Sequence, residues 1–155
     1  MRLAAALAVL ALATASVAGG EAWAQAASPV YDQTCAMCHQ RGGAGAPGAF
    51  PRLAGRAGAL AALPAGRKMM ISTVVFGMSG AVEADKQTIH GMMPALVQLN
   101  DAQVAQALSY IASLDGKKAR PFTAAEVAAV RAQGRLTPAQ VNAMAHDPAL
   151  AKAAP

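Results

Sequence analysis

The segment Cys35–His39 (CAMCH) constrains this chain more than any other feature. We expect it on a helix, because Ser28-Pro29 has the pattern of an N-cap followed by proline at the first helical position. Residues at i, i+3 and i+4 share one face of a helix, so Cys35, Cys38 and His39 point the same way. Two thiols and an imidazole in this arrangement suit a haem held by two thioethers, with the imidazole on its iron.

Three other interpretations of this segment compete with haem attachment. A structural zinc site needs about four ligands, but the chain has only two cysteines, and His90 and His146 are not a closely spaced pair. A thioredoxin-like redox pair needs a βαβ surround, which the sequence pattern does not predict. A disulfide leaves the adjacent His39 without a role. We therefore expect one haem c, covalently attached through Cys35 and Cys38.

The first residues have the pattern of a secretory signal peptide. Met1-Arg2 begins with a positive charge, Leu3 to Ala13 is unbroken apolar sequence, and small residues follow. The small-x-small rule is met at Ala24 and again at Ala26, which predicts cleavage after one of them. The alternative is an uncleaved N-terminal anchor. We assign residues 1–24 to the signal peptide and expect the mature protein in the periplasm.

The composition excludes several classes of protein. The chain has 155 residues, enough for one domain, and is 55% hydrophobic but only 14% charged. Its longest apolar run is interrupted at Thr14, short of the roughly 18 residues of a membrane span, which excludes a polytopic membrane protein. Two cysteines are too few for a disulfide scaffold, and the charge balance does not favour disorder. The net charge of +5 comes from scattered residues rather than a Lys/Arg block, so we expect no nucleic-acid partner.

Hydrophobic spacing and capping patterns predict an all-α chain. Three helix starts share an apolar residue, an Asn or Thr cap, Gln or Glu three residues later, and then valine, which is a capping box with a hydrophobic staple. The spacings between these starts differ, so we interpret them as shared capping chemistry rather than an internal repeat. The predicted helices cover residues 31–40, 67–76, 101–114, 124–133 and 138–146.

Two segments lack a clear helical pattern. Residues 41–66 are rich in Gly, Pro and Ala, and we expect a long connection there with little secondary structure of its own. Residues 79–91 form a second irregular stretch, with a small hairpin turning near Asp85-Lys86. The expected organisation is a haem domain at 25–116 followed by a helical C-terminal extension at 117–155, with a disordered end from Asp147 onward.

The sixth ligand of the iron has several candidates. Methionines within helical stretches have a core role by default, and Met78 follows the helix stop at Gly77 without a rigid loop around it. The segment Gly91–Pro94 differs, because it is irregular, precedes a strong helix cap, and its proline restricts the backbone. We favour Met93, with Met92 and then His90 as alternatives. The full set of candidates comprises Met37, Met69, Met70, Met78, Met92, Met93, Met144, His90 and His146.

From Tyr31 to Leu114 the chain resembles a class I c-type cytochrome of the small bacterial periplasmic kind. The resemblance rests on Tyr31, Cys35–His39, 47–55, 91–96 and Tyr110-Ile111. It implies helices wrapped around one covalently bound haem, with His39 as the proximal and Met93 as the distal iron ligand. It further implies that the carbonyl of Pro47 or its neighbour orients His39, and that Tyr31 lies near Tyr110 where the first and last core helices cross.

The chain departs from the family pattern at three places. The doubled Met92-Met93 leaves the ligand ambiguous by one residue, 85–87 replaces the usual glycine turn, and the tail beyond Asp115 has no place in the minimal fold. The Phe50–Gly55 stretch and residues 125–131 look like the monohaem cytochromes paired with periplasmic dehydrogenases or nitrite reductases.

These features predict an electron carrier that cycles haem iron between Fe(III) and Fe(II), not an enzyme, with no substrate at the iron. Its expected partners are periplasmic dehydrogenases, reductases or terminal oxidases. The main alternative is a cytochrome subunit of a larger periplasmic oxidoreductase, and a third class is a five-coordinate peroxidase or gas sensor. Five basic residues could surround the haem edge or hold its propionates, and ordinary solvated charge is the alternative for each. They are Arg52, Arg56, Arg67, Lys68 and Lys86.

Overall fold

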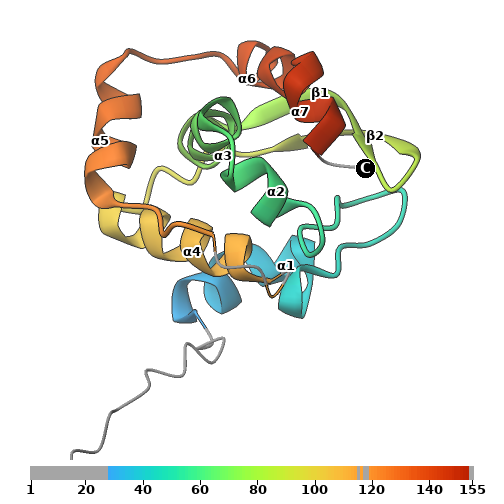
Figure 1. Ribbon diagram of the computed structural model, residues 1–155, viewed down its shortest axis with the longest axis horizontal. Helices are drawn as coiled ribbons and strands as arrows, with labels where there is room; N and C mark the ends of the chain where they lie inside the picture. The colour runs from blue at the N-terminus through green and yellow to red at the C-terminus, as the bar shows by residue number, and fades with distance from the viewer. Residues whose placement is uncertain (1–27, 115, 117–118, 154–155) are drawn as a thin grey trace, which may run out of the picture.

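The computed structural model describes residues 28–114, 116 and 119–153, which form a mostly helical molecule with one antiparallel hairpin (Figure 1). The predicted signal peptide and its cleavage sites lie outside the described residues. In the part of the chain that the structure describes, no helix is long and apolar enough to cross a membrane. The elements in chain order are η1 (Tyr31–Cys35), α1 (Ala36–His39), η2 (Arg41–Gly43), α2 (Ala57–Ala61), α3 (Pro64–Phe76), β1 (Met78–Ala84), β2 (Gln87–Met93), α4 (Asp101–Ser113), α5 (Ala124–Ala132), α6 (Pro138–Ala145) and α7 (Pro148–Ala153).

The helical segment that carries the CAMCH motif begins as its sequence predicts. The Oγ of Ser28 accepts a hydrogen bond from the Tyr31 N–H at 3.3 Å, which satisfies one of the free N–H groups at the helix start. The first turn is a π-helical turn, η1, and the chain then continues as α1 to His39. Gln40 ends the helix with a φ of 60°.

The three predicted capping boxes are confirmed. Asn100, Thr123 and Thr137 each accept a hydrogen bond from the N–H three residues later, and the side chain there bonds back to the N-cap N–H. Helices α4, α5 and α6 each end one residue before the predicted boundary. These patterns were predictable because both partners of each bond lie within four consecutive residues.

The prediction of a connection with little secondary structure over 41–66 is wrong for its second half. Helix α2 lies within it, and α3 begins at Pro64 rather than at residue 67. Ala57 and Ala61 are each 3% exposed, so these small residues bury one face of α2 in the core. At Gly66, an added Cβ would clash with the Leu60 carbonyl oxygen. The glycine therefore allows α3 to pack directly against α2.

The predicted hairpin is present, so the all-α expectation needs this correction. The expectation that the Gly91–Pro94 segment is irregular is also wrong, because strand β2 continues through Met93. Strands β1 and β2 pair in antiparallel register, and the two turn residues Asp85 and Lys86 have φ of 52° and 61°. Two successive left-handed residues are what a two-residue hairpin turn of the right twist requires, and aspartate tolerates that conformation. The guanidinium of Arg52 also bonds the Asp85 carboxylate, which ties the turn to the 41–56 segment.

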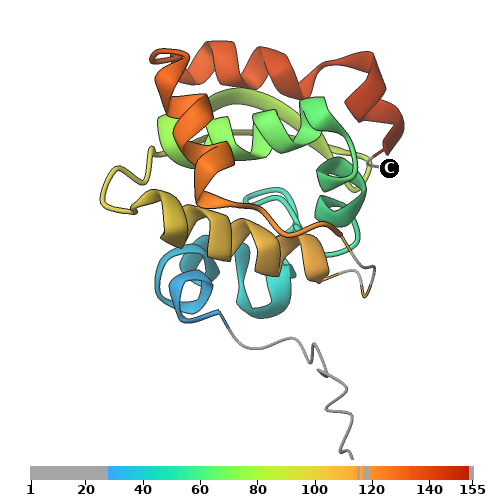
Figure 2. The ribbon, with the colours of Figure 1, turned by 60° about the vertical axis from the view of Figure 1, so that its left-hand side comes forward.

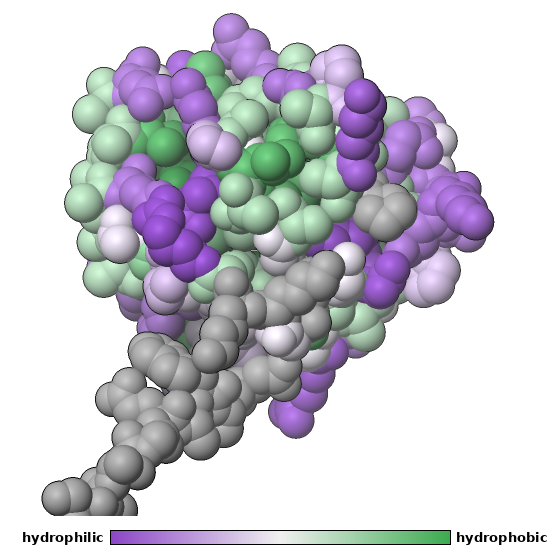
Figure 3. All heavy atoms as spheres, viewed as in Figure 1, coloured by the Kyte–Doolittle hydropathy of each residue, from purple (hydrophilic) through white to green (hydrophobic). Residues whose placement is uncertain are grey.

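The C-terminal extension packs onto the rest of the molecule and contributes to the same core (Figure 2). Helix α5 contacts α3 and α4, α6 contacts α3 and β1, and α7 contacts α2. The expected disordered end is wrong for residues 148–153, which form α7. Its Leu150 is 2% exposed, and the Asp147 carboxylate accepts the Ala149 N–H at 2.8 Å. Figure 3 shows apolar side chains over the middle of this face, with a strongly hydrophilic group left of centre and further hydrophilic side chains around the margin.

Candidate functional site

The imidazole of His39 has a defined tautomer. Its Nδ1 lies 2.9 Å from the carbonyl oxygen of Pro51. A carbonyl can only accept, so Nδ1 carries the hydrogen and donates it, and in the neutral ring the lone pair is then on Nε2. Burial lowers the pKa of His39, which favours that neutral ring, although the bond to Pro51 acts in the opposite direction. An oriented neutral imidazole with its Nε2 lone pair available is the form that binds a metal.

The expectation that Pro47 or its neighbour orients His39 is wrong, because Pro51 supplies the carbonyl. The segment Ala46–Ala49 forms a turn in which the Ala49 N–H donates to the Ala46 carbonyl at 3.0 Å. The bridge between Ala46 and Phe50 closes the turn and leaves Pro47 at its tip. A proline followed by glycine at the centre of a turn is a type II signature, with Gly48 at a φ of 73°. This local signal indicates the turn, but which carbonyl reaches His39 depends on how the chain folds back over the 12 residues to Pro51.

Cys35 and Cys38 are both free thiols in the structure, Cys35 buried and Cys38 partly buried. Burial, together with the neighbouring Cys38, raises the pKa of the Cys35 thiol to about 11, so this thiol is neutral at physiological pH. Among the described residues, no group of three or more His, Cys, Asp or Glu side chains is placed to hold a metal ion. Cys35 ends η1 and Cys38 lies on α1 directly before His39, so the three side chains of the motif belong to one continuous helical segment.

Met92 and Met93 point to opposite sides of strand β2, as successive residues of a strand do. The Met92 side chain is 73% exposed, whereas Met93 is partly buried and packs against the hydrophobic core. Of the two candidates, only Met93 faces the interior of the molecule. Met78, directly opposite Met93 in the hairpin register, also packs against the core.

The backbone around Met93 is held by the end of α3. An added Cβ at Gly77 would lie 2.8 Å from the Met93 carbonyl oxygen and 2.9 Å from the Ala95 nitrogen, so these segments are in direct contact. Just beyond, the Leu96 N–H donates to the Val74 carbonyl at 2.9 Å. Gly77 has a φ of 79°, a conformation that suits glycine. It therefore serves both as the helix stop and as the contact point for the Met93 segment.

The remaining ligand candidates have other surroundings. Met69 and Met70 are buried on α3, and Met144 packs against the core from α6, which are ordinary packing roles. Met37 is 78% exposed, and His90 is exposed on the hairpin. The Nε2 of His146 lies 3.1 Å from the Ala81 carbonyl oxygen.

Among the basic residues singled out from the sequence, Arg56 has an unsatisfied donor. Its Nη2 donates to the Glu83 carbonyl at 2.7 Å, but its buried Nε has no partner among the described residues. Burial lowers the pKa of the Arg56 guanidinium, so an additional anionic acceptor there would be stabilising. A haem propionate is an anionic acceptor of this kind, so the unsatisfied Nε of Arg56 fits a bound haem.

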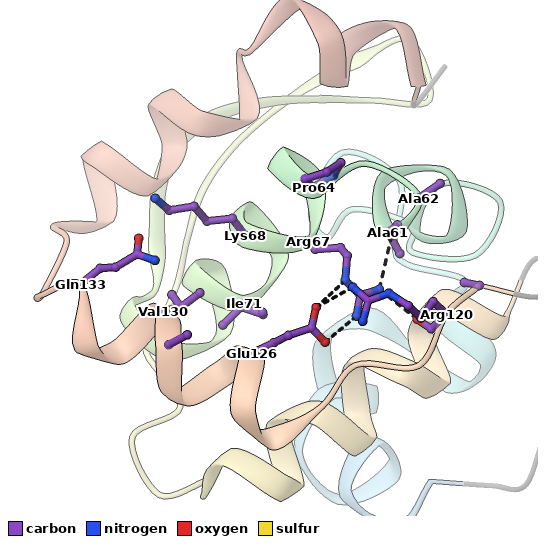
Figure 4. A pocket seen from close by; sticks show the side chains of 12 residues that line it. Ala61, Ala62, Pro64, Arg67, Lys68, Ile71, Arg120, Glu126, Val130 and Gln133 are labelled. Atoms are coloured by element: carbon purple, nitrogen blue, oxygen red, sulfur yellow. Dashed lines mark hydrogen bonds and ion pairs between the residues drawn. The ribbon is translucent and has the colours of Figure 1, made fainter.

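Arg67 has a structural role instead. It is 6% exposed, and its Nε and Nη2 donate to the two carboxylate oxygens of Glu126, each at 2.9 Å (Figure 4). Its guanidinium carbon lies 3.7 Å from the centre of the Phe122 ring. The pair lies in a cleft of about 480 Å³, to which Lys68 also contributes, and none of Cys35, Cys38, His39 and Met93 lines it. Arg67 therefore anchors the extension, away from the motif.

The expected contact between Tyr31 and Tyr110 is confirmed. Their ring centroids lie 4.9 Å apart, and the Tyr31 hydroxyl donates to the Gln40 carbonyl at 2.7 Å. The N-terminal helical segment and α4 thus pack together beside the two cysteines, as the resemblance implies.

A profile of the cytochrome c family matches residues 24–115 of the chain. The chain belongs to the cytochrome c family. It is 43% identical to a cytochrome c-552 of Thermus thermophilus over 131 residues, covering 81% of this chain and 87% of that protein. A second Thermus thermophilus cytochrome c-552 is 42% identical, covering 74% and 89%. Cytochrome c-555 of Chlorobaculum thiosulfatiphilum is 33% identical over 91 residues, covering 57% and 92%.

Membership of this family settles the cofactor. Cytochromes c bind haem c covalently through a cysteine pair, and Cys35 and Cys38 have the spacing that this attachment requires. The protein is a class I c-type cytochrome that carries haem c on these two residues, and the members of its family are electron carriers. The family match ends at residue 115, before α5, so the C-terminal extension lies outside the matched region.

Proposed function

We propose that this cytochrome is a freely diffusing periplasmic electron carrier, with His39 and Met93 as the axial ligands of its haem iron. The observation that carries the proposal is the 2.9 Å contact between His39 Nδ1 and the Pro51 carbonyl oxygen. It directs the basic lone pair to Nε2, on the residue that directly follows the second attachment cysteine.

Met93 is the proposed distal ligand. It packs against the core, Met92 faces solvent, and the contacts of Gly77 and Leu96 hold its backbone in place. A chain that supplies both axial ligands leaves no open coordination position for a substrate, which favours electron transfer over catalysis at the iron. When bound, the haem supplies the one-electron couple Fe(III)/Fe(II).

Arg56 is the proposed partner of a haem propionate, through its buried Nε, which has no hydrogen-bond partner among the residues that the structure describes. The net charge of +5 suits attraction to an acidic partner surface, and such attraction weakens as salt rises. Redox partners form small and short-lived contacts. We therefore expect turnover with an acidic donor or acceptor to slow at high ionic strength.

The test is a redox titration and a ligand-binding assay on the purified holoprotein. We expect a reversible one-electron couple, a methionine–ferric haem charge-transfer band in the near infrared, and slow or absent binding of carbon monoxide and cyanide. Rapid binding of carbon monoxide without displacement of a protein ligand contradicts the proposal and supports the five-coordinate class.

The alternative is a cytochrome subunit of a larger oxidoreductase, with the C-terminal extension docked on a catalytic chain. The apolar residues Phe122, Val127 and Leu150 of the extension are buried within this chain's own core, which favours the free carrier. A pull-down from periplasm with mass spectrometry separates the two. A stable stoichiometric complex supports the subunit, and a monomer reduced by several donors supports the carrier.

Export to the periplasm is part of the same proposal. It is supported by the charged start, apolar core and small-residue exit of residues 1–24. N-terminal sequencing of the purified protein tests it, with a start at Gln25 or Ala27 as the expected result. A start at Met1 in the membrane fraction would indicate a retained anchor.

A further inference from the structure

Helix α6 of the C-terminal extension covers the outer edge of strand β1. In a two-stranded sheet each strand has one edge without a strand partner, and its backbone groups need other hydrogen bonds. The Ala81 carbonyl oxygen accepts two such bonds, from Asn142 Nδ2 at 2.8 Å and from His146 Nε2 at 3.1 Å. Both donors come from α6 and its C-cap, 61 and 65 residues further along the chain.

The approach of α6 to β1 is close. An added Cβ at Gly80 would lie 2.7 Å from the Asn142 Oδ1, so the Asn142 amide rests directly on the strand backbone. Helix α6 is itself anchored elsewhere, because it packs against α3 and its Val141 is fully buried. Helix α6 therefore restrains the position of the hairpin, because its own position is set by packing against α3.

The hairpin transmits this support to Met93. Ala81 pairs with His90 on β2, and Met93 follows three residues later at the open end of the same strand. On its other side the Met93 segment rests on Gly77 at the end of α3. Replacement of Met93 at the iron by an external ligand requires the thioether to move away, and a two-stranded hairpin held at both of these places resists that movement.

We infer that α6 of the C-terminal extension positions the distal ligand, with Asn142 and His146 as positioning residues that keep the hairpin, and hence Met93, in place at the iron. The inference rests on the proposed function, because it takes Met93 as the ligand. It assigns a role to a segment that lies beyond residues 24–115, the region matched by the cytochrome c family profile. By linkage, the effect is reciprocal: the Met93–iron bond also stabilises the attachment of α6.

Imidazole binding to the ferric holoprotein measures how firmly Met93 is held, because imidazole must displace it. Asn142→Asp keeps the shape of the side chain but replaces the donating amide with acceptor oxygens. We expect it to tighten apparent imidazole binding by about fivefold, the effect of one lost neutral hydrogen bond. Gly80→Ala separates α6 from β1 by a different route and has the same expected direction. Unchanged imidazole affinity in both variants overturns the inference.

Glu126→Gln is the matched control. It weakens the attachment of α5 to Arg67 but touches neither β1 nor Ala81. We expect it to lower the stability of the protein and to leave imidazole affinity within about twofold of the wild type, as for changes at independent sites. If Glu126→Gln tightens imidazole binding as much as Asn142→Asp does, general loosening explains the effect and the specific role of α6 is wrong.

Hydrogen exchange provides a second measurement that does not depend on variants. In the wild-type ferric holoprotein, saturation with imidazole should increase the exchange rate of amides in α6 and β1, and leave those of α4 unchanged. Unaltered exchange in α6 counts against the inference.

The near-infrared methionine band separates the failure of this inference from failure of the proposed function. A wild-type protein without the band, or a Met93→Ala variant that retains it, shows that Met93 is not the ligand and overturns both. In the other case, the wild type has the band and Met93→Ala abolishes it, but Asn142→Asp and Gly80→Ala leave the imidazole affinity unchanged. That result overturns only the role of α6.

Discussion

Met78 and Met93 lie directly opposite each other at the open end of the hairpin, and both pack against the hydrophobic core. Directly opposed residues have their Cβ atoms about 5 Å apart on the same face of the sheet. Two thioethers therefore share the face on which the distal ligand is expected. The Gly77 contact is common to both segments, because Gly77 directly precedes Met78. Pro94 and the bond from the Leu96 N–H to the Val74 carbonyl restrain the segment that follows Met93.

Substitution of the three neighbouring methionines identifies the distal ligand. We expect Met93→Ala to abolish the near-infrared methionine band, to lower the midpoint potential by on the order of 0.1 V, and to open the iron to external ligands. Met92→Ala should leave band and potential largely intact, because this side chain is 73% exposed. Met78→Ala should cost about 1 to 2 kcal/mol of stability and keep the band. Loss of the band in Met78→Ala or Met92→Ala, with Met93→Ala unaffected, would reassign the ligand.

Gly77→Ala tests the contact between α3 and the Met93 segment. The new Cβ would lie 2.8 Å from the Met93 carbonyl oxygen, at a φ of 79°, so both backbone strain and a clash oppose it. We expect a loss of about 2 kcal/mol or more in denaturant unfolding of the holoprotein, with a weaker methionine band. Gly91→Ala is the control, because a Cβ there meets no atom within 4 Å. A similar loss in both variants would mean that the contact with Met93 is unimportant.

Tyr31 should make stability pH-dependent in the alkaline range. It is fully buried and donates to the Gln40 carbonyl, and burial raises its pKa from 10.0 to about 12. The unfolded chain loses this proton near pH 10 while the folded protein keeps it. Stability is therefore fully present below pH 10 and is lost at about 1.4 kcal/mol per pH unit up to pH 12.

Tyr31→Phe measures this contribution. We expect the variant to be about 1 kcal/mol less stable than the wild type below pH 10, from loss of the hydrogen bond. The difference should shrink above pH 10 and change sign before pH 12, because only the wild type loses stability through the Tyr31 titration and that loss exceeds about 1 kcal/mol. Parallel stability curves for the two proteins across that range would refute the assignment.

The ion pair of Arg67 and Glu126 should contribute stability in the neutral range. Hydrogen bonding to Arg67 lowers the pKa of Glu126 from 4.5 to about 2. A carboxylate with a depressed folded pKa stabilises the protein above its unfolded pKa, and that stability is lost as pH falls from 4.5 towards 2. We expect Glu126→Gln to cost about 2 kcal/mol at pH 7, discounted because the carboxylate is 27% exposed.

Denaturant unfolding of the holoprotein at pH 7 and at pH 3 tests this. The cost of Glu126→Gln should be smaller at pH 3, where part of the advantage of the ionised carboxylate is lost. Asp101→Asn is the comparison, because it removes the more exposed pair with Arg131, 33% exposed on each side, and should cost less than about 1 kcal/mol. A cost of Glu126→Gln that is the same at both pH values would exclude this linkage.

Features whose partners lie close in sequence were predictable. Each capping box joins residues three apart, and the hairpin turns at Asp85-Lys86. The Cys35–His39 motif likewise carries its own chemistry at a helical spacing. The predictions that were wrong concern residues farther apart in the sequence. The His39 acceptor is Pro51 rather than Pro47, because the bridge between Ala46 and Phe50 sets which carbonyl faces the ring.

The sequence alone therefore determined the family, the covalent haem attachment and the helices that begin with strong caps, since all of these depend on short-range patterns. Only the tertiary structure decided that Arg67 is an internal anchor, with Glu126 59 residues away, and that the tail is an ordered layer. It also decided that Asn142 bonds Ala81 on the hairpin that carries Met93. Such pairs form because burial leaves a charge or a strand edge in need of a partner, and only the folded chain brings that partner near.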